Sequence, residues 1–227
     1  MTTYLLDILD RLNNDNYRSG EEKIDDTWES GKTVKYEAML EVQKLSDESL
    51  LTELIQEFKA NPKDSNASNM LFLISSIVTN TLNTSGMNFM YDLLLSKNNS
   101  FLSHCLGFYS SRVQLPKKYK IKPFIDLFNN RSQWIRSDSY GAVANSLHDE
   151  KESILLSRLS TLTKAYDIER LLLSLSRFCG KPSLTEVEKH LKSKSSRVRA
   201  AAKMCITSIN VQSSKSSGNQ LDNMHNL

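Results

Sequence analysis

The sequence predicts an all-α protein, a right-handed α-α superhelix of about five to six stacked helix pairs. Three stretches of the C-terminal half share one pattern of apolar positions. The first apolar residue of the pattern is Ile135, Ile168 or Val198, and these residues lie 33 and 30 positions apart. A unit of that length is one supersecondary element that cannot bury its apolar face alone and must stack on its neighbours. Only seven Gly and four Pro occur in 227 residues, and no segment alternates like a strand.

Six helices are predicted before residue 110 from apolar stripes at helical spacing. Tyr4, Ile8 and Leu12 define the first stripe, and Leu71, Ile74 and Val78 define a stripe broad enough to be buried on two sides. Ser85-Gly86 is predicted to end that long helix. The six ranges are 4–12, 34–45, 50–58, 65–82, 87–96 and 101–109.

Six more helices follow a basic loop at 116–122, and short polar turns separate them. Because successive helices joined by short turns pack antiparallel, these helices are expected to form three pairs. Their ranges are 124–128, 134–147, 154–162, 168–178, 184–191 and 198–209. We expect one repeat domain over 1–210, irregular over 1–45, and a flexible tail at 211–227, whose Ser, Asn and Lys content is too polar to bury.

Composition indicates an ordinary soluble chain, with 39% hydrophobic residues and a mean hydropathy of −0.41. The longest apolar run, 70–78, is interrupted by two serines and falls short of the ~20 residues of a membrane helix. The N-terminus carries Asp7 and Asp10 within its apolar stripe and has no basic leader, so no signal peptide is expected. Cys105, Cys179 and Cys205 are widely spaced, which suits buried thiols in a reducing cytoplasm. We expect a cytoplasmic protein without a metal or a cofactor.

Charge divides the chain into two parts of opposite sign. Residues 1–60 hold 14 acidic and 7 basic side chains, a balance of −7, whereas the other 167 residues hold 12 acidic and 22 basic, a balance of +10. The N-terminal part therefore favours basic partners, and the remainder favours acidic ones.

The segment Pro182–Ile209 carries a recognisable pattern. A first helix with Leu184 and Val187 leads through a polar turn into Arg197-Val198-Arg199, followed by three alanines. This segment resembles a HEAT repeat of the HEAT/armadillo-like α-helical family, and 120–210 as a whole resembles such repeats, with Ile135-Arg136 in the Val-Arg place. The resemblance implies small residues where helices approach closely, an arginine that caps or pairs within the turn, and a curved surface that binds a protein or a nucleic acid.

The sequence contains none of the common sequence motifs of enzymes. A Walker loop, GxGxxG, HExxH and GxSxG are all missing from the sequence. His104 adjoins Cys105, but adjacent helical residues point about 100° apart and do not form a nucleophile–base pair. We therefore interpret Cys105 as buried, His104 as half-exposed and the protein as non-enzymatic.

The leading hypothesis is a protein-binding solenoid with one basic partner. An inhibitor or immunity protein that sequesters a basic toxin or nuclease is its most concrete form, and an adaptor subunit of a larger assembly is an alternative. Acidic side chains speed the capture of a basic partner, and aromatic anchors then lengthen its residence. The candidate contact residues are Trp28, Tyr36, Asp25, Asp26, Glu29 and Glu41.

A nucleic-acid-binding alternative stays open. Trp134 and Asp138 are four residues apart on one helix, and Arg170 lies near the start of the next matching helix. This aromatic–carboxylate–arginine set on a HEAT-like scaffold is similar to that of the alkylpurine DNA glycosylases, which implies base stacking by the tryptophan and support of glycosidic cleavage by the acid. Basic side chains suited to phosphates are Lys117, Lys118, Lys120, Arg197 and Arg199.

Overall fold

The computed structural model describes residues 1–16, 33–96 and 99–224, with side chains described up to residue 211 except at 99 and 100. Within these ranges the chain forms twelve α-helices and no strand, which confirms the all-α prediction. The chain divides into two compact units, Met1–Cys105 and Leu106–Leu227. The expectation of a single domain over 1–210 depends on how these units pack and stays a prediction.

Unit 1 is built around one central helix. Its members are α1 (Thr3–Leu12), α2 (Val34–Gln43), α3 (Ser49–Ala60), α4 (Ala67–Thr81), α5 (Thr84–Leu95) and most of α6 (Asn99–Gly107). Helix α4 contacts α1, α2, α3 and α5, and its Leu71, Ile74 and Val78 are fully buried. The predicted burial of this helix on more than one side is thereby confirmed.

The break between α4 and α5 falls earlier than the sequence indicates. Helix α4 ends at Thr81, and Leu82 takes the left-handed conformation with φ 54°. Ser85 and Gly86 instead lie in the first turn of α5, where the Asn83 side chain accepts a hydrogen bond from the Gly86 amide at 3.0 Å. A Cβ at Gly86 would lie 2.2 Å from Cγ2 of Val78, so this glycine is required for the close approach of α4 and α5.

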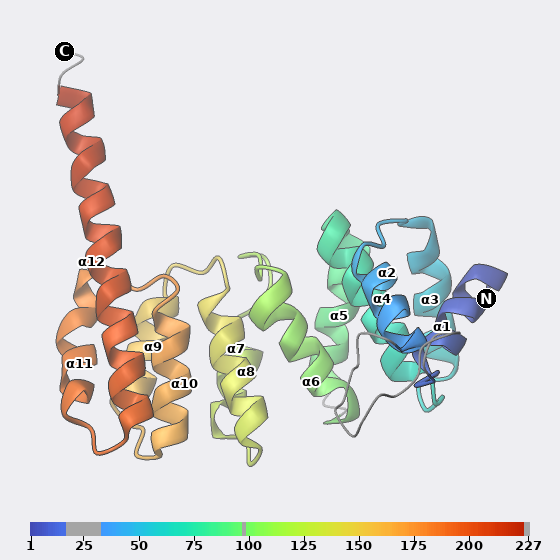
Figure 1. The fold of residues 1–227 in the computed structure, drawn as a ribbon, viewed down its shortest axis with the longest axis horizontal. Helices are drawn as coiled ribbons and strands as arrows, with labels where there is room; N and C mark the ends of the chain where they lie inside the picture. Colours follow the sequence, from blue (N-terminus) through green and yellow to red (C-terminus); the bar gives the residue numbers. More distant parts are fainter. Residues whose placement is uncertain (17–32, 97–98, 225–227) are drawn as a thin grey trace. The chain divides into compact units, whose positions relative to one another are not determined.

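Unit 2 contains three successive helix pairs (Figure 1). After a π-helical turn at Phe108–Arg112, the pairs are α7 (Lys122–Asp126) with α8 (Gln133–Ala144), α9 (Lys151–Leu159) with α10 (Ala165–Leu175), and α11 (Leu184–Glu188) with α12 (Ser196–Met224). The second helices form one layer, because α10 contacts both α8 and α12. The predicted pairing is confirmed over this part of the chain.

Small residues allow the helices of unit 2 to pack closely. Ser139 of α8 and Ala202 of α12 are both fully buried. A Cβ on Gly141 would come within 2.9 Å of the Ser110 Cβ, so α8 and the π-helical turn meet almost backbone to backbone. The small residues that the repeat resemblance implies therefore occupy helix contacts.

Helix α12 extends beyond the end of its partner helices, as Figure 1 shows. Among the side chains described, which end at residue 211, the last buried one is Ile209, and the backbone stays helical to Met224. The end of the folded domain at 210 stays a prediction. The flexibility predicted for 211–227 remains a prediction.

Candidate binding surfaces

Two arginines stabilise equivalent turns in unit 2. Arg136, the fourth residue of α8, donates through Nη1 to the Asn130 and Arg131 carbonyls at 2.8 and 3.1 Å. Arg199, the fourth residue of α12, donates in the same way to the carbonyls six and five positions before it, at 2.7 and 3.0 Å. The turn-capping arginine implied by the repeat resemblance is therefore present in both helices.

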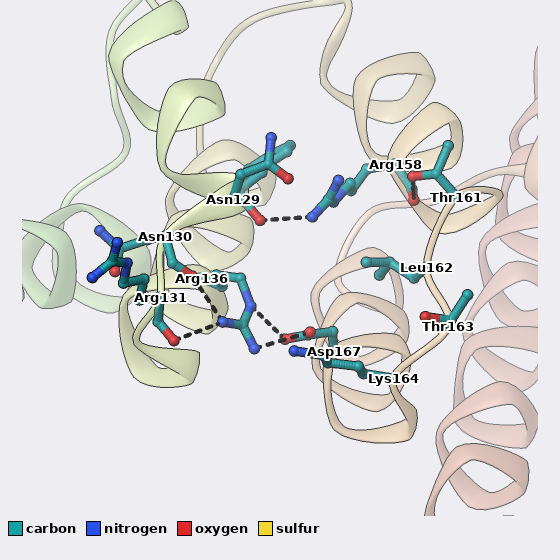
Figure 2. A pocket seen from close by; sticks show the side chains of 11 residues that line it. Asn129, Asn130, Arg131, Arg136, Arg158, Thr161, Leu162, Thr163, Lys164 and Asp167 are labelled. Carbon is teal, nitrogen blue, oxygen red and sulfur yellow. Dashed lines mark hydrogen bonds and ion pairs between the residues drawn. The ribbon is translucent and has the colours of Figure 1, made fainter.

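Arg136 also joins two neighbouring repeats. Its Nε and Nη2 donate to the two carboxylate oxygens of Asp167 at 2.9 and 3.0 Å. Asp167 is the third residue of α10, and both side chains are buried, with exposed fractions of 9% and 3%. Figure 2 shows this bridge linking the turn before α8 to the start of α10. Because the geometry is bidentate, the bridge fixes the orientation of the two helix starts as well as their separation.

Beside this bridge lies a pocket of about 440 Å³, here called the turn pocket (Figure 2). Residues 128–131, before α8, line one side, and residues 161–164, before α10, line the other. Arg158 reaches from α9 toward the 129–131 turn and donates to the Phe128 carbonyl at 2.7 Å. The pocket wall is therefore fixed by two arginines, of which only Arg136 is paired with a carboxylate among the described residues.

A second hollow, of about 620 Å³, adjoins the turn pocket. The two share Phe128, Asn129, Arg158 and Thr161, and the second adds Ile125 and Ile154 from α7 and α9. The Arg158 side chain therefore lines both the polar turn pocket and the more apolar second hollow. Sequence patterns did not predict either hollow, because the lining residues come from turns about 30 positions apart in the chain.

Tyr140 lies in the core of unit 2 and interacts with Arg158. It is fully buried, and burial raises the pKa of its phenol, while the Arg158 guanidinium opposes that rise. The Nε of Arg158 is buried without a hydrogen-bond partner among the described residues. Part of the Arg158 side chain is therefore withdrawn from solvent without full hydrogen bonding, which costs free energy unless another group satisfies the donor.

Trp134 is the most exposed large apolar side chain of the described residues, at 65%. It is the second residue of α8, and its ring meets Tyr166, the second residue of α10, edge to face at 6.2 Å between centroids. These rings lie at the helix starts, where the turn pocket also lies. Exposed aromatic residues of this kind are common anchors in binding surfaces.

Asp138 and Arg170 are brought together on the same two helices. Burial raises the pKa of the half-buried Asp138, and the positive charge of Arg170 partly reverses this shift. The Arg170 Nε donates to the Ser137 hydroxyl at 2.7 Å, which orients the guanidinium. The two charged groups are therefore close enough to interact electrostatically. Neither they nor Trp134 line the turn pocket or its neighbour.

The predicted phosphate-binding lysines have other contacts in the structure. Lys117 pairs with Asp149 at 2.6 Å, and the Lys118 amine lies 5.1 Å from the Tyr119 ring centroid. Tyr119 is itself buried, so its ring is not presented for stacking on a base. Lys120 and Arg197 are exposed, whereas the Nη1 of Arg199 is engaged by the turn carbonyls described above.

On unit 1, α1 and α2 carry exposed or half-exposed side chains that are here called the α1–α2 surface: Tyr4, Tyr36, Met39, Leu40 and Glu41. Tyr36 and Leu40 are 37% and 40% exposed and lie on one side of α2. The Tyr4 hydroxyl donates to Glu41 at 3.1 Å, and Arg11 donates to the same carboxylate at 2.8 Å. Glu41 therefore joins α1 to α2. The other predicted contacts, Asp25, Asp26, Trp28 and Glu29, lie outside the described residues.

His104 and Cys105 do not form a nucleophile–base pair. Burial lowers the pKa of His104 and raises the pKa of Cys105 to about 12, so both groups stay neutral near pH 7. The sulfurs of Cys179 and Cys205 lie 3.1 Å apart, and both are fully buried. Over the described ranges, His, Cys, Asp and Glu side chains form no group of three or more that would hold a metal ion.

Comparison with known proteins identifies the fold. A designed armadillo repeat protein in complex with the peptide (KR)4 matches with a TM-score of 0.53 and 10% identity, over 91% of this chain and 100% of that chain. Another designed armadillo repeat protein matches at a TM-score of 0.44 and 11% identity, over 89% of this chain and 98% of that one. No protein-family model and no curated protein matches the sequence.

The chain therefore has the armadillo/HEAT-like helical repeat fold, as the sequence predicts. This fold is compatible with protein binding. In the part of the chain that the structure describes, every helix is too short or too polar to cross a membrane.

Proposed function

We propose that this is a non-enzymatic, cytoplasmic protein-binding repeat protein whose partner is a basic protein or peptide. The observation that carries the proposal is the α1–α2 surface, where Tyr36 and Leu40 are exposed on one side of α2. Aromatic and aliphatic side chains left in water are suited to become the desolvated anchors of an interface. The acidic balance of unit 1 favours cationic groups on the partner.

The charge of unit 1 supports a basic partner. Residues 1–105 contain 16 acidic and 9 basic side chains, a balance of −7, and all five carboxylates of the 17–32 segment contribute to it. A surface of this sign attracts a cationic partner and accelerates its association at low salt. The four predicted contact residues in that segment, Asp25, Asp26, Trp28 and Glu29, belong to this acidic part of the chain.

The similarity to the designed armadillo repeat protein supports the choice of a first ligand. That protein was solved in complex with the peptide (KR)4, in which basic residues alternate. At 10% identity the likeness shows the fold alone, so the peptide serves here as a chemical probe of a basic, extended partner. An inhibitor or immunity protein that sequesters a basic toxin or nuclease is the most concrete form of the proposal, and an adaptor role uses the same surface.

Binding of a fluorescently labelled (KR)4 peptide, with an acidic (DE)4 peptide as the charge control, tests the proposal. We expect the basic peptide to bind and Tyr36→Ala to weaken binding by about tenfold, as for an interface anchor. Leu95→Ala, another exposed apolar position of unit 1, is the matched control and should bind like the wild type. Equal binding of the two peptides, or equal losses in the two variants, would contradict the proposal.

A second candidate function is supported by a separate observation in unit 2. Residues 106–227 carry 20 basic and 10 acidic side chains, a balance of +10, and Trp134 is exposed near the Asp138–Arg170 pair. This combination favours DNA binding, with base excision as its enzymatic form. Duplex DNA containing an alkylated purine should then bind with an affinity that falls steeply with salt. The function is rejected if Trp134→Ala binds this DNA as well as the wild type does and the protein releases no alkylated base.

A further inference from the structure

We propose that the turn pocket of unit 2 binds the phosphate group of an organic phosphate monoester. The site is distinct from the α1–α2 surface, so it does not depend on the proposed function. Besides Arg136, which is paired with Asp167, its cationic members are Arg131 in the turn before α8, Arg158 from α9 and Lys164 immediately before α10. Figure 2 labels all of them around the pocket.

The charge balance of the pocket favours an anion. Asp167 is its only carboxylate, and the two hydrogen bonds from Arg136 engage both oxygens of that group. In the described residues, neither Arg158 nor Lys164 forms an ion pair. These two positive charges therefore lie at the pocket without a compensating negative charge, and an oxyanion placed between them gains charge-assisted hydrogen bonds from both.

Neutral donors near these cations suit the remaining oxygens of a phosphate. The Asn129 amide and the Thr163 hydroxyl line the pocket and have no hydrogen-bond partner within the described chain. Thr161 is different, because its hydroxyl already donates to the Arg158 carbonyl at 2.8 Å. Two cationic groups and two neutral donors match the three terminal oxygens of a phosphate monoester better than the two of a carboxylate.

The size of the site indicates that the phosphate is attached to a larger body. A volume of about 440 Å³ lies in the range of small-molecule pockets and exceeds what a phosphate ion needs. The adjoining hollow shares Arg158 with the turn pocket and is also lined by Ile125 and Ile154. A ligand can therefore place its phosphate against Arg158 and Lys164 and its apolar part against the two isoleucines. A small phosphorylated molecule and a phosphorylated peptide side chain share this chemistry.

The pocket is formed before a ligand arrives. Arg136 hydrogen-bonds both to the 129–131 turn and to Asp167 of α10. Arg158 of α9 donates to the Phe128 carbonyl. Hydrogen bonds therefore connect the two sides of the pocket. A preorganised site loses little conformational entropy on binding.

Isothermal titration calorimetry on the full chain at constant ionic strength tests the proposal. The probes are inorganic phosphate, phenyl phosphate, a phosphoserine peptide and the same peptide without phosphate. We expect saturable binding of the phosphorylated probes and none of the unphosphorylated peptide. Tighter binding of phenyl phosphate than of the phosphopeptide assigns the site to a small molecule, and the reverse order assigns it to a protein ligand. Failure of every phosphorylated probe to bind overturns the proposal.

Matched variants locate the binding. Lys164→Gln removes one charge-assisted contact and should weaken phenyl phosphate binding by about tenfold. Arg158→Lys keeps the charge but loses the planar set of donors, so it should also weaken binding, with circular dichroism confirming that the fold is retained. Lys203→Gln removes the same charge from an exposed position of α12 and should change nothing. An equal loss in Lys203→Gln and Lys164→Gln would show non-specific attraction to a basic unit and reject the site.

Discussion

Replacing Asp167 or Arg136 measures how much the ion pair between the first and second helix pairs of unit 2 contributes to the free energy of unfolding. Asp167→Ala leaves the buried Arg136 guanidinium with only the two turn carbonyls as acceptors. Arg136→Met leaves a 3%-exposed carboxylate without a cation and the two carbonyls without their donor. Because breaking a buried pair strands a charge, each variant should lose about 3–5 kcal/mol of unfolding free energy, with Arg136→Met the more damaging.

Urea unfolding followed by circular dichroism gives these losses, and hydrogen exchange in α8 and α10 assigns them to unit 2. The double variant should lose about 1–3 kcal/mol less than the sum of the singles, because no buried charge is left unpaired. Asp126→Asn is the matched control, since the Lys122–Asp126 pair of the same unit is exposed and should contribute only about 0.3–0.5 kcal/mol. Single-variant losses no larger than that of the control would refute the reasoning.

Three further predictions concern backbone and thiol positions. Leu82→Gly should raise the unfolding free energy by about 0.5–1 kcal/mol, because the relief of a left-handed, exposed leucine outweighs the added chain entropy, and thermal unfolding measures the gain. Gly141→Ala should cost about 1–3 kcal/mol through its clash with Ser110, whereas Gly107→Ala, which has open space, should not destabilise in the same assay. Cys105, with its pKa raised to about 12, should be thiolate in about one molecule in ten thousand at pH 8, so Ellman's reagent should label it only after unfolding. Labelling of the folded chain at the rate of a free thiol would contradict this last expectation.

Helix existence was predictable because it depends on local periodicity, whereas several helix ends were not. The stripe through Leu71, Ile74 and Val78 identifies α4 and its burial directly. The end predicted at 82 lies one residue from the observed end at Thr81, but the break expected at Ser85-Gly86 was placed too late. Leu82 adopts a conformation that glycine would ordinarily supply, and Gly86 instead allows the close packing of α4 on α5. The helix predicted over 101–109 similarly changes to a π-helical turn at Phe108, which apolar spacing does not encode.

The turn-capping arginines were predictable from the repeat pattern, but the partner of Arg136 was not. The middle repeat fits the pattern less well because Glu169 stands in the arginine place. The acid that matters is Asp167, 31 residues after Arg136, and it serves the preceding repeat rather than its own. A search for opposite charges separated by one repeat length would have found this pair. The turn pocket requires in addition the positions of α9 and two turns, which only the folded chain supplies.

The boundary between the two units also separates the charges of the chain, −7 before it and +10 after it. The net charge of +3 therefore describes neither unit, and the molecule behaves as a polyampholyte with two blocks. We expect it to be retained on both anion- and cation-exchange resins near neutral pH. At low ionic strength, the acidic block of one molecule attracts the basic block of another, so purified protein should associate on dilution of salt and disperse as the Debye length shortens to about 8 Å at physiological salt.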